Sequence, residues 1–201
     1  MGIIRSYFYN KELSSLQDAL ERCLRDREDG KAFVYKKYYG YLMAIIIRYV
    51  KQDVDAEELV NESFVRVFRK LESFNRDIDD ENLEKSFRAW IGRIAANISI
   101  DFLRSKKQFY SVEDLGEGDM HTPAVQLDSR LEVNEIMRLL DQLPEIQKTI
   151  FNLYEIEGYS HDEIAQMLNI PDSTSRTYLT RAKQKLRKLY LDYTGVVQEI
   201  R

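Results

Sequence analysis

Basic side chains gather near the C-terminal end of a chain that is acidic as a whole. Between Asp172 and Lys188 six bases stand against the single acid Asp172, although the formal net charge of the 201-residue chain is -4. The bases are Arg176, Arg181, Lys183, Lys185, Arg187 and Lys188. Ammonium and guanidinium groups bind phosphates, and guanidinium groups also bind base edges in a groove. The cluster therefore points to nucleic acid, against the alternative of an ordinary solvated helix face.

The residues around these bases predict a helix-turn-helix. Ser160 is followed three residues later by Glu163, which is the spacing of a capping box at a helix start. Pro171 disfavours a helical conformation for the residue before it, and Asp172 or Ser173 can cap a second helix. In a helix-turn-helix the second helix enters the major groove. The residues expected to reach DNA from it are Ser173, Thr174, Arg176, Thr177, Thr180, Arg181, Lys183, Lys185 and Lys188.

A second basic stretch lies in the middle of the chain. Five bases there are opposed by the single acid Asp101, which suits a strand of nucleic acid lying across a helix. These bases are Arg88, Arg93, Arg104, Lys106 and Lys107. Asn97 lies among them, with apolar Ala96 and Ile98 on either side. An amide there has no obvious local role, and a hydrogen bond inside the domain is one reading of it.

Glu58, Asn61 and Glu62 form a polar patch on another predicted helix. Their i, i+3, i+4 spacing puts them on one side of that helix, away from apolar Leu59 and Phe64. Three polar side chains in such positions are, taken singly, typical of a solvated face. Residue types alone therefore favour the solvated face over a docking site.

Carboxylates in the segment 75–86 could hold magnesium, as in a metal-dependent nuclease. They are Asp77, Asp79, Asp80 and Glu81. No second carboxylate cluster and no catalytic base accompanies them, so solvated loop acids are the better reading. Cys23 is the only cysteine, and there are only two histidines, which speaks against a zinc site. We expect no metal, no cofactor and no enzymatic activity.

Helices are the elements that must position these residues. Only three prolines and eight glycines occur, and apolar residues recur at helical spacing, so we expect an all-α protein. The helices predicted in the first half run over 13–24, from 31 to about 50, from 53 or 55 to 74, and from about 87 onwards. Asp53 or Asp55 would cap the third of them, and the polar segment 75–86 is expected to be a loop.

Two small helical domains are predicted, joined by a flexible acidic linker. Residues 1–108 form the first domain and residues 109–130 the linker, in which acids dominate and no apolar period survives. Residues 131–201 form the second domain, where Pro144 opens a helix in its first turn and Gly158 closes it. The helix-turn-helix follows directly.

Membrane insertion is not expected. The longest apolar run, Leu42–Ile47, is far shorter than the ~20 residues that cross a bilayer, and no signal pattern opens the chain. We expect a cytoplasmic protein.

Three stretches of the chain resemble a known family, the extracytoplasmic-function (ECF) sigma factors of bacteria. The first is "LPEIQKTIFNLYEIEGYSHDEIAQMLNIPDSTSRTYLTRAKQKLRKL", which is similar to the promoter-reading domain of the family. The others are "DAEELVNESFVRVFRKLESF" and "FRAWIGRIAANISIDFLRSKK", which are similar to its other conserved domain. The resemblance runs from about Leu13 to Leu189, with both domains in the family's order.

This resemblance implies a role for each group of residues. Glu58, Asn61 and Glu62 would dock on the clamp helices of core RNA polymerase, with the flap as a further contact. Residues for the minus-ten element would be Phe74, Arg88, Arg93, Ile94, Asn97, Arg104, Lys106 and Lys107. Among them Phe74, Ile94 and Asn97 would line a pocket for a base flipped from the melted strand. The second domain would read the minus-thirty-five element.

The implied function is transcription initiation: binding core polymerase, directing it to promoters and assisting their melting. Promoter DNA, core polymerase and an anti-sigma factor are the implied partners. Tyr154 and Tyr178 stand where family members often carry bases, which indicates an unusual or weakly held minus-thirty-five sequence. The alternative is a helix-turn-helix repressor that binds an operator as a dimer and acts without polymerase.

Overall fold

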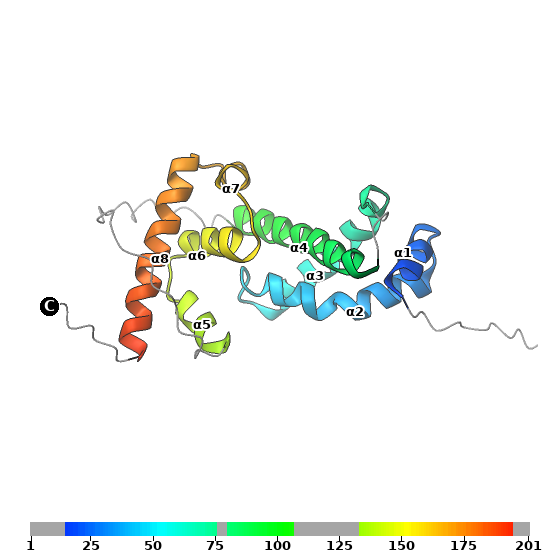
Figure 1. Ribbon diagram of the computed structural model, residues 1–201, viewed down its shortest axis with the longest axis horizontal. Helices are drawn as coiled ribbons and strands as arrows, with labels where there is room; N and C mark the ends of the chain where they lie inside the picture. The colour runs from blue at the N-terminus through cyan, green and yellow to red at the C-terminus, as the bar shows by residue number, and fades with distance from the viewer. Residues whose placement is uncertain (1–14, 76–79, 107–132, 195–201) are drawn as a thin grey trace, which may run out of the picture. The chain divides into compact units, whose positions relative to one another are not determined.

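The structure is a computed structural model that describes residues 15–75, 80–106 and 133–194. Every regular element in these ranges is a helix, which confirms the predicted all-α class (Figure 1). The first half holds α1 (Leu16–Leu24), α2 (Glu28–Ile46), α3 (Asp53–Lys70), the short η1 (Leu71–Ser73) and α4 (Asp80–Ser105). The second half holds α5 (Val133–Leu140), α6 (Glu145–Phe151), the π-helical η3 (Asn152–Ile156), α7 (His161–Leu168) and α8 (Asp172–Thr194).

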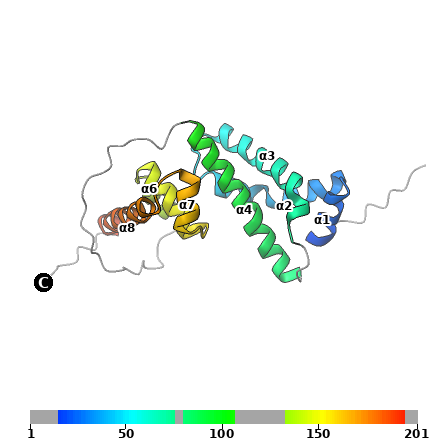
Figure 2. The same cartoon turned by 90° about the horizontal axis from the view of Figure 1, so that it is seen from above.

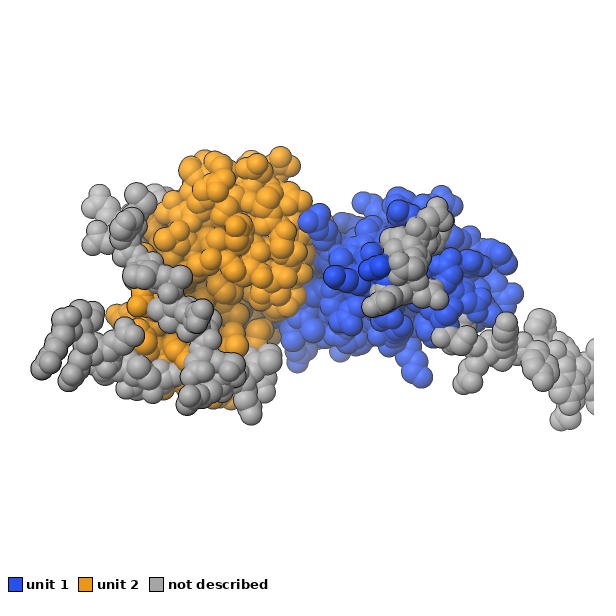
Figure 3. Space-filling model, viewed as in Figure 1, with its two compact units in different colours: residues 1–47, 52–95 blue, residues 48–51, 96–201 orange. Residues whose placement is uncertain are grey.

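The chain divides into two compact units (Figure 3). Unit 1 comprises residues 1–47 and 52–95, and unit 2 comprises residues 48–51 and 96–201, so the division passes through α4. The predicted linker, residues 109–130, lies outside the described residues. The domain limits at 108 and 131 therefore stay a prediction. No helix in the described ranges is long and apolar enough to cross a membrane.

A close helix pair opens unit 1. The side chain of Ser15 caps α1 by accepting a hydrogen bond from the Asp18 backbone, and Leu20 and Cys23 are buried. Gly30 of α2 packs directly against α1, since a Cβ built on it would lie 2.7 Å from the Ala19 carbonyl oxygen. A glycine is required at this crossing because any larger residue would force the two helices apart.

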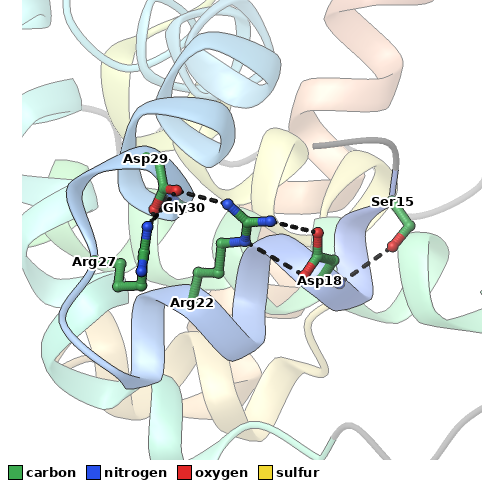
Figure 4. A network of polar contacts seen from close by, with 6 residues as sticks. All are labelled: Ser15, Asp18, Arg22, Arg27, Asp29 and Gly30. Carbon is green, nitrogen blue, oxygen red and sulfur yellow. Dashed lines mark hydrogen bonds and ion pairs between the residues drawn. The ribbon is translucent and has the colours of Figure 1, made fainter. Parts of the chain in front are cut away.

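Charged groups reinforce the same helix pair (Figure 4). Arg22 of α1 forms ion pairs with Asp18 at 3.2 Å and with Asp29 of α2 at 2.6 Å. Asp29 also accepts hydrogen bonds from Arg27, and the two arginines hold the pKa of its carboxyl well below the usual range. Cys23 is buried between the two helices, and burial raises the pKa of its thiol to about 11.

Two of the predicted helix starts in unit 1 are wrong. The N-cap of α3 is Gln52, which makes no side-chain capping bond, whereas Asp53 and Asp55 lie in the first turn. Carboxylates are stabilised there by the helix dipole without being caps. The fourth helix, α4, begins at Asp80 rather than near Phe87, so the predicted loop 75–86 is mostly helix. Residues 76–79, including Asp77 and Asp79, lie outside the described residues.

Helix α8 organises unit 2 and packs against α6 and α7 (Figure 1). Leu140, Leu143 and Ala182 form the centre of a small core, and Met137, Phe151 and Leu186 pack around it. Pro144 precedes α6 as its N-cap, one position before the predicted first turn. Gly158 adopts a left-handed conformation with φ +74 after η3, as expected for a glycine that ends a helix.

Candidate nucleic-acid interface

The helix-turn-helix is formed by α7 and α8, as the sequence predicts. Ser160 and Glu163 make both bonds of the capping box: the Ser160 hydroxyl accepts from the Glu163 N–H, and the Glu163 carboxylate accepts from the Ser160 N–H at 2.8 Å. Helix α7 then ends at Leu168, and Asn169 takes up a left-handed conformation with φ 53. The reversal therefore lies two residues before Pro171. Asparagine is one of the few residues that tolerate this region, so Asn169 is the sequence signal for this turn.

One side of α8 is buried and the other is exposed. Ser175, Leu179 and Ala182 are buried, so this side of α8 faces the interior of the domain. Most of the residues predicted to reach DNA are exposed: Ser173, Arg176, Thr177, Thr180, Lys183, Lys185 and Lys188. Thr174 and Arg181 are half-buried at the border. The structure thus brings these nine residues to one helix and presents most of them to solvent.

Several of these side chains already have partners within α8. Arg176 forms an ion pair with Asp172 at 3.3 Å, one helical turn before it. The hydroxyl of Thr177 donates to the Ser173 carbonyl at 2.9 Å, and that of Thr180 donates to the Arg176 carbonyl at 3.0 Å. Because both hydroxyls already donate their hydrogen, the threonines can only accept further hydrogen bonds. In this rotamer they therefore suit donor groups on bases better than phosphates, which offer only acceptors.

Lys183 is held by two residues of η3, the segment before α7. Its ammonium group lies 2.6 Å from a Glu155 carboxylate oxygen and 5.9 Å from the centre of the Tyr154 ring. Both partners come from the π-helical η3. Lys185 and Lys188 lie further along the exposed side, which makes them the more accessible groups for phosphates.

His161 and Ser175 form a buried polar contact that the sequence reasoning missed. The Nδ1 atom of His161 lies 2.9 Å from the Ser175 hydroxyl and so joins α7 to α8, while the imidazole stacks on Tyr154. Burial, followed by the charge of Arg176, lowers the pKa of His161. A neutral imidazole suits this site, because a charge there would be buried beside an arginine. At position 154, where family members often carry a base, this chain thus has a tyrosine that packs against the His161 ring of the helix-turn-helix.

The patch on α3 has the predicted orientation. Glu58, Asn61 and Glu62 are all exposed, whereas Leu59 and Phe64 are buried. Glu62 forms an ion pair with Arg66 at 2.9 Å. Asn61 accepts a hydrogen bond at 3.0 Å from the hydroxyl of Tyr35 on α2. The exposed side of α3 also carries apolar Val54 and Val65, which sequence reasoning did not single out.

The predicted basic surface of α4 is partly held in local contacts. The Arg88 guanidinium lies 4.4 Å from the ring centre of Tyr41, whose hydroxyl donates to the Arg88 carbonyl. Arg93 is exposed, Arg104 lies 3.8 Å from Asp101, and Lys106 lies over the Phe102 ring. Lys107 lies outside the described residues. These arginines and the lysine are exposed, as contact with a strand requires.

The three residues predicted for a base pocket differ in exposure. Asn97 is exposed, although Ala96 and Ile98 beside it are buried, and no hydrogen bond of its amide is found within the described residues. The reading of Asn97 as an internal hydrogen-bonding group therefore has no support in this part of the chain. Phe74 and Ile94 are almost fully buried, and Phe74 packs against Phe87 and Trp90 with ring centres 5.3 and 5.1 Å away.

Trp90 belongs to the aromatic core of unit 1. It lies against Phe74 and Phe87, with ring centres 5.1 and 5.9 Å away. No group of three or more His, Cys, Asp or Glu side chains that could hold a metal ion occurs in the described ranges. The described part of the molecule thus offers an acid-and-amide patch on α3 and exposed basic residues on α4 and α8.

Two family models match the chain in these regions. Residues 34–109 match "Sigma-70 region 2", and residues 134–186 match "Sigma-70, region 4". The first match contains α3 and α4 with their patches, and the second contains the helix-turn-helix. Such a pair of regions defines a class of proteins that recruit RNA polymerase to promoters.

Curated relatives agree with the family models. The chain is 29% identical to the ECF RNA polymerase sigma-E factor of Haemophilus influenzae, with 79% of this chain and 87% of the relative covered. It is 26% identical to the RNA polymerase sigma-H factor of Pseudomonas aeruginosa (86% and 92% covered) and 25% identical to the ECF RNA polymerase sigma factor SigW of Bacillus subtilis (88% and 97% covered). A solved structure of the sigma factor RpoE from Bartonella quintana, in complex with the anti-sigma factor NepR, aligns with a TM-score of 0.47 at 19% identity, covering 79% of this chain and 94% of that one.

The chain belongs to the sigma-70 family and, within it, to the ECF RNA polymerase sigma factors. It is accordingly a transcription initiation factor, which binds core RNA polymerase and directs it to promoters.

Proposed function

We propose that three exposed surfaces of this sigma factor have separate roles in initiation. The surface of α3 binds polymerase, that of α4 helps to melt the promoter, and that of α8 reads the promoter sequence. The observation that carries the proposal is that one chain exposes an acid-and-amide patch on α3 and a row of basic and hydroxyl side chains on α8. A repressor would need only the second of these. The protein itself carries out no catalysis in this scheme.

Glu58, Asn61 and Glu62 bind the clamp helices of core polymerase. Two carboxylates and an amide on one exposed side of α3 complement a basic partner surface. Val54 and Val65 on the exposed side of the same helix add apolar area, which such interfaces use at their centre. The polymerase flap is the proposed contact of the second domain.

Asn97 reads a base that has left the stack of the minus-ten element. Its exposed amide can pair with the Watson–Crick edge of a flipped base, and Phe74 and Ile94 offer the small apolar edges that remain exposed on them. Arg88, Arg93, Arg104, Lys106 and Lys107 neutralise the phosphates of that strand. Arg88 keeps its place on the Tyr41 ring while doing so.

The exposed side of α8 reads the minus-thirty-five element. Ser173, Thr174, Arg176 and Thr177 lie in the first turns, the end of a recognition helix that contacts base edges. Thr180 and Arg181 follow, and Lys185 and Lys188 contact phosphates. Lys183 reaches DNA only if its ammonium group leaves Glu155, so it contributes least.

An anti-sigma factor is the proposed regulatory partner, and the cytoplasm is the proposed location. The B. quintana relative is described in complex with an anti-sigma factor. The acidic overall charge of this chain suits a protein partner with basic groups.

A transcription assay tests the proposal. Core polymerase is supplied with genomic promoter fragments, with and without this protein, and specific transcripts are sequenced from their 5′ ends. The proposal requires transcripts that appear only with the protein and share two upstream sequence elements. A helix-turn-helix repressor acting alone would give no such transcripts and would reduce those made by another holoenzyme.

A further inference from the structure

We infer that Tyr35 of α2 is a positioning residue for polymerase binding: its hydroxyl fixes the amide of Asn61 so that the Asn61 N–H donors point to the partner. This inference rests on the proposed docking patch of α3 and adds to it a residue from another helix. Tyr35 lies outside the three residues of that patch and far from them in sequence.

A hydrogen bond between the two helices is the first observation. The Tyr35 hydroxyl donates to Oδ1 of Asn61 at 3.0 Å, and α2 and α3 lie side by side in both views (Figures 1 and 2). An amide has an acceptor end and a donor end, and a donor directed at Oδ1 selects one of its two orientations. The Nδ2 group then faces away from Tyr35.

The Tyr35 ring is itself fixed in place. Its centre lies 4.6 Å from that of Phe64 and 5.4 Å from that of Tyr39, and Phe64 is buried in the core of unit 1. A ring held on two sides places its hydroxyl with little freedom, since tyrosine has only two side-chain torsions. The core thus sets the position of an exposed amide through one hydroxyl group.

An exposed asparagine without such a partner would be ordered only when the polymerase binds. Ordering a free side chain at an interface lowers affinity, and ordering it beforehand removes that loss. Asn61 lies between the carboxylates of Glu58 and Glu62 along α3, so its donors can meet an acceptor of the partner while the carboxylates meet its bases. Tyr35 therefore raises affinity without being required to touch the polymerase.

The test compares four full-length proteins in binding to core polymerase: wild type, Tyr35→Phe, Asn61→Ala and the double variant. Tyr35→Phe keeps the ring and removes only the hydroxyl. The dissociation constant is expected to rise by about threefold to tenfold, the loss typical of one neutral hydrogen bond. Tyr39→Phe is the matched control, because it removes the same atom one turn along α2, where no hydrogen bond of the hydroxyl is found within the described residues.

Coupling between the two positions decides the outcome. If Tyr35 acts through Asn61, Tyr35→Phe has no further effect in the Asn61→Ala protein. Two results would overturn the inference while leaving the docking patch intact. One is that the losses of affinity of the two single variants add up in the double variant. The other is that Asn61→Ala binds polymerase more weakly while Tyr35→Phe binds it like the wild type. Wild-type affinity of Asn61→Ala would instead remove Asn61 from the patch. If Tyr35→Phe weakened binding only because the protein folds less well, thermal unfolding would show a lower melting temperature. The loss of affinity would then also appear in the Asn61→Ala background, and this result counts against the inference.

Discussion

Asn97 combines an exposed amide with buried neighbours on both sides. Because Ala96 and Ile98 are packed in the interior, the backbone around Asn97 is held firmly while its side chain is open to a ligand. In the proposed role of Asn97, hydrogen bonds from this amide to a flipped base would form only after the promoter has melted. The residue should therefore affect the opening of DNA and leave the binding of polymerase unchanged.

Replacing Asn97 by alanine is expected to slow promoter opening by about tenfold, which corresponds to ~1.4 kcal/mol for the lost hydrogen bonds. The reactivity of melted thymines to permanganate measures opening directly. Asn61→Ala, assayed at saturating protein, is the control and should open the promoter at the wild-type rate. Normal opening by Asn97→Ala, together with a lower melting temperature, would assign the amide to internal structure.

Arg176 and Lys188 separate two kinds of DNA contact on α8. Arg176 lies in the second turn of the helix and forms an ion pair with Asp172, which orients its guanidinium near the end expected to enter the groove. Lys188 lies about three turns further along and is exposed. In the proposed reading of the promoter, Arg176 would contact a base edge and Lys188 a phosphate.

Arg176→Ala is expected to lower promoter affinity by about 1–3 kcal/mol and to relax preference at one or two minus-thirty-five positions. Lys188→Ala should weaken all promoters alike and reduce the salt slope by about one. Binding of holoenzyme to a promoter library at several salt concentrations measures both effects. Equal weakening of every sequence by both variants would make α8 an electrostatic clamp and move sequence choice to the first domain.

Between elements, the crossing of α1 and α2 depends on one glycine. The atoms nearest to a Cβ on Gly30 are the Ala19 carbonyl oxygen, the Arg22 Cβ and the Cys23 nitrogen, all within 2.9 Å, and two of them belong to the backbone. Flexible side-chain ends could move aside, but a helix backbone cannot do so alone. Gly40 lies on the same helix with nothing within 4 Å of its Cβ position.

Gly30→Ala is therefore expected to destabilise the protein by about 1–3 kcal/mol through overpacking. Gly40→Ala should instead stabilise it by up to ~1 kcal/mol, because alanine has the better helix propensity. Urea unfolding followed by circular dichroism measures both free energies. A Gly30→Ala protein as stable as wild type would mean that α1 is not tightly packed on α2 in solution.

Helices with a clear apolar stripe could be predicted from sequence, whereas their acidic starts could not be placed. The residues before Phe87 are polar, and we interpreted them as a loop, yet acids near the N-terminus of a helix are favoured by its dipole. The same ambiguity made Asp53 look like a cap. For α7, the capping box of Ser160 and Glu163 could be predicted because both of its bonds are local.

Contacts that depend on how two helices cross could not be predicted. The hydrogen bond from Tyr35 to Asn61 and the contact of His161 with Ser175 join residues of different helices, and no local spacing encodes them. Lys183 was predicted as a DNA contact from its charge alone, while its pairing with Glu155 depends on the π-helical turn before α7. Residue type thus indicated the chemistry of the surfaces, and tertiary structure decided which side chains are available.

For the whole molecule, charge is distributed unevenly. The net charge is -4, although the segment from Asp172 to Lys188 is strongly basic, so the rest of the chain carries a larger excess of acid. Acidic surface repels DNA at long range and weakens nonspecific binding. We therefore expect this protein to gain its affinity for promoters mainly after it has joined the polymerase.

The free protein is accordingly expected to bind a promoter duplex with a dissociation constant of roughly 10⁻⁴–10⁻⁶ M at physiological salt, the range of nonspecific binding. Fluorescence anisotropy of a labelled duplex measures it, with the holoenzyme as the reference. Specific binding by the free protein in the nanomolar range, with a dimer in light scattering, would contradict this expectation and favour a repressor.

The left-handed backbone at Asn169 also bears on how this sequence can evolve. Glycine would fit the conformation best, but an asparagine codon needs two nucleotide changes to become a glycine codon. Single changes lead instead to Asp, His, Lys, Ser, Thr, Tyr or Ile, and among these only Asp and His share a preference for the left-handed region. At position 169, therefore, only substitutions to Asp or His can arise by a single nucleotide change and still favour the backbone conformation of the turn before the recognition helix.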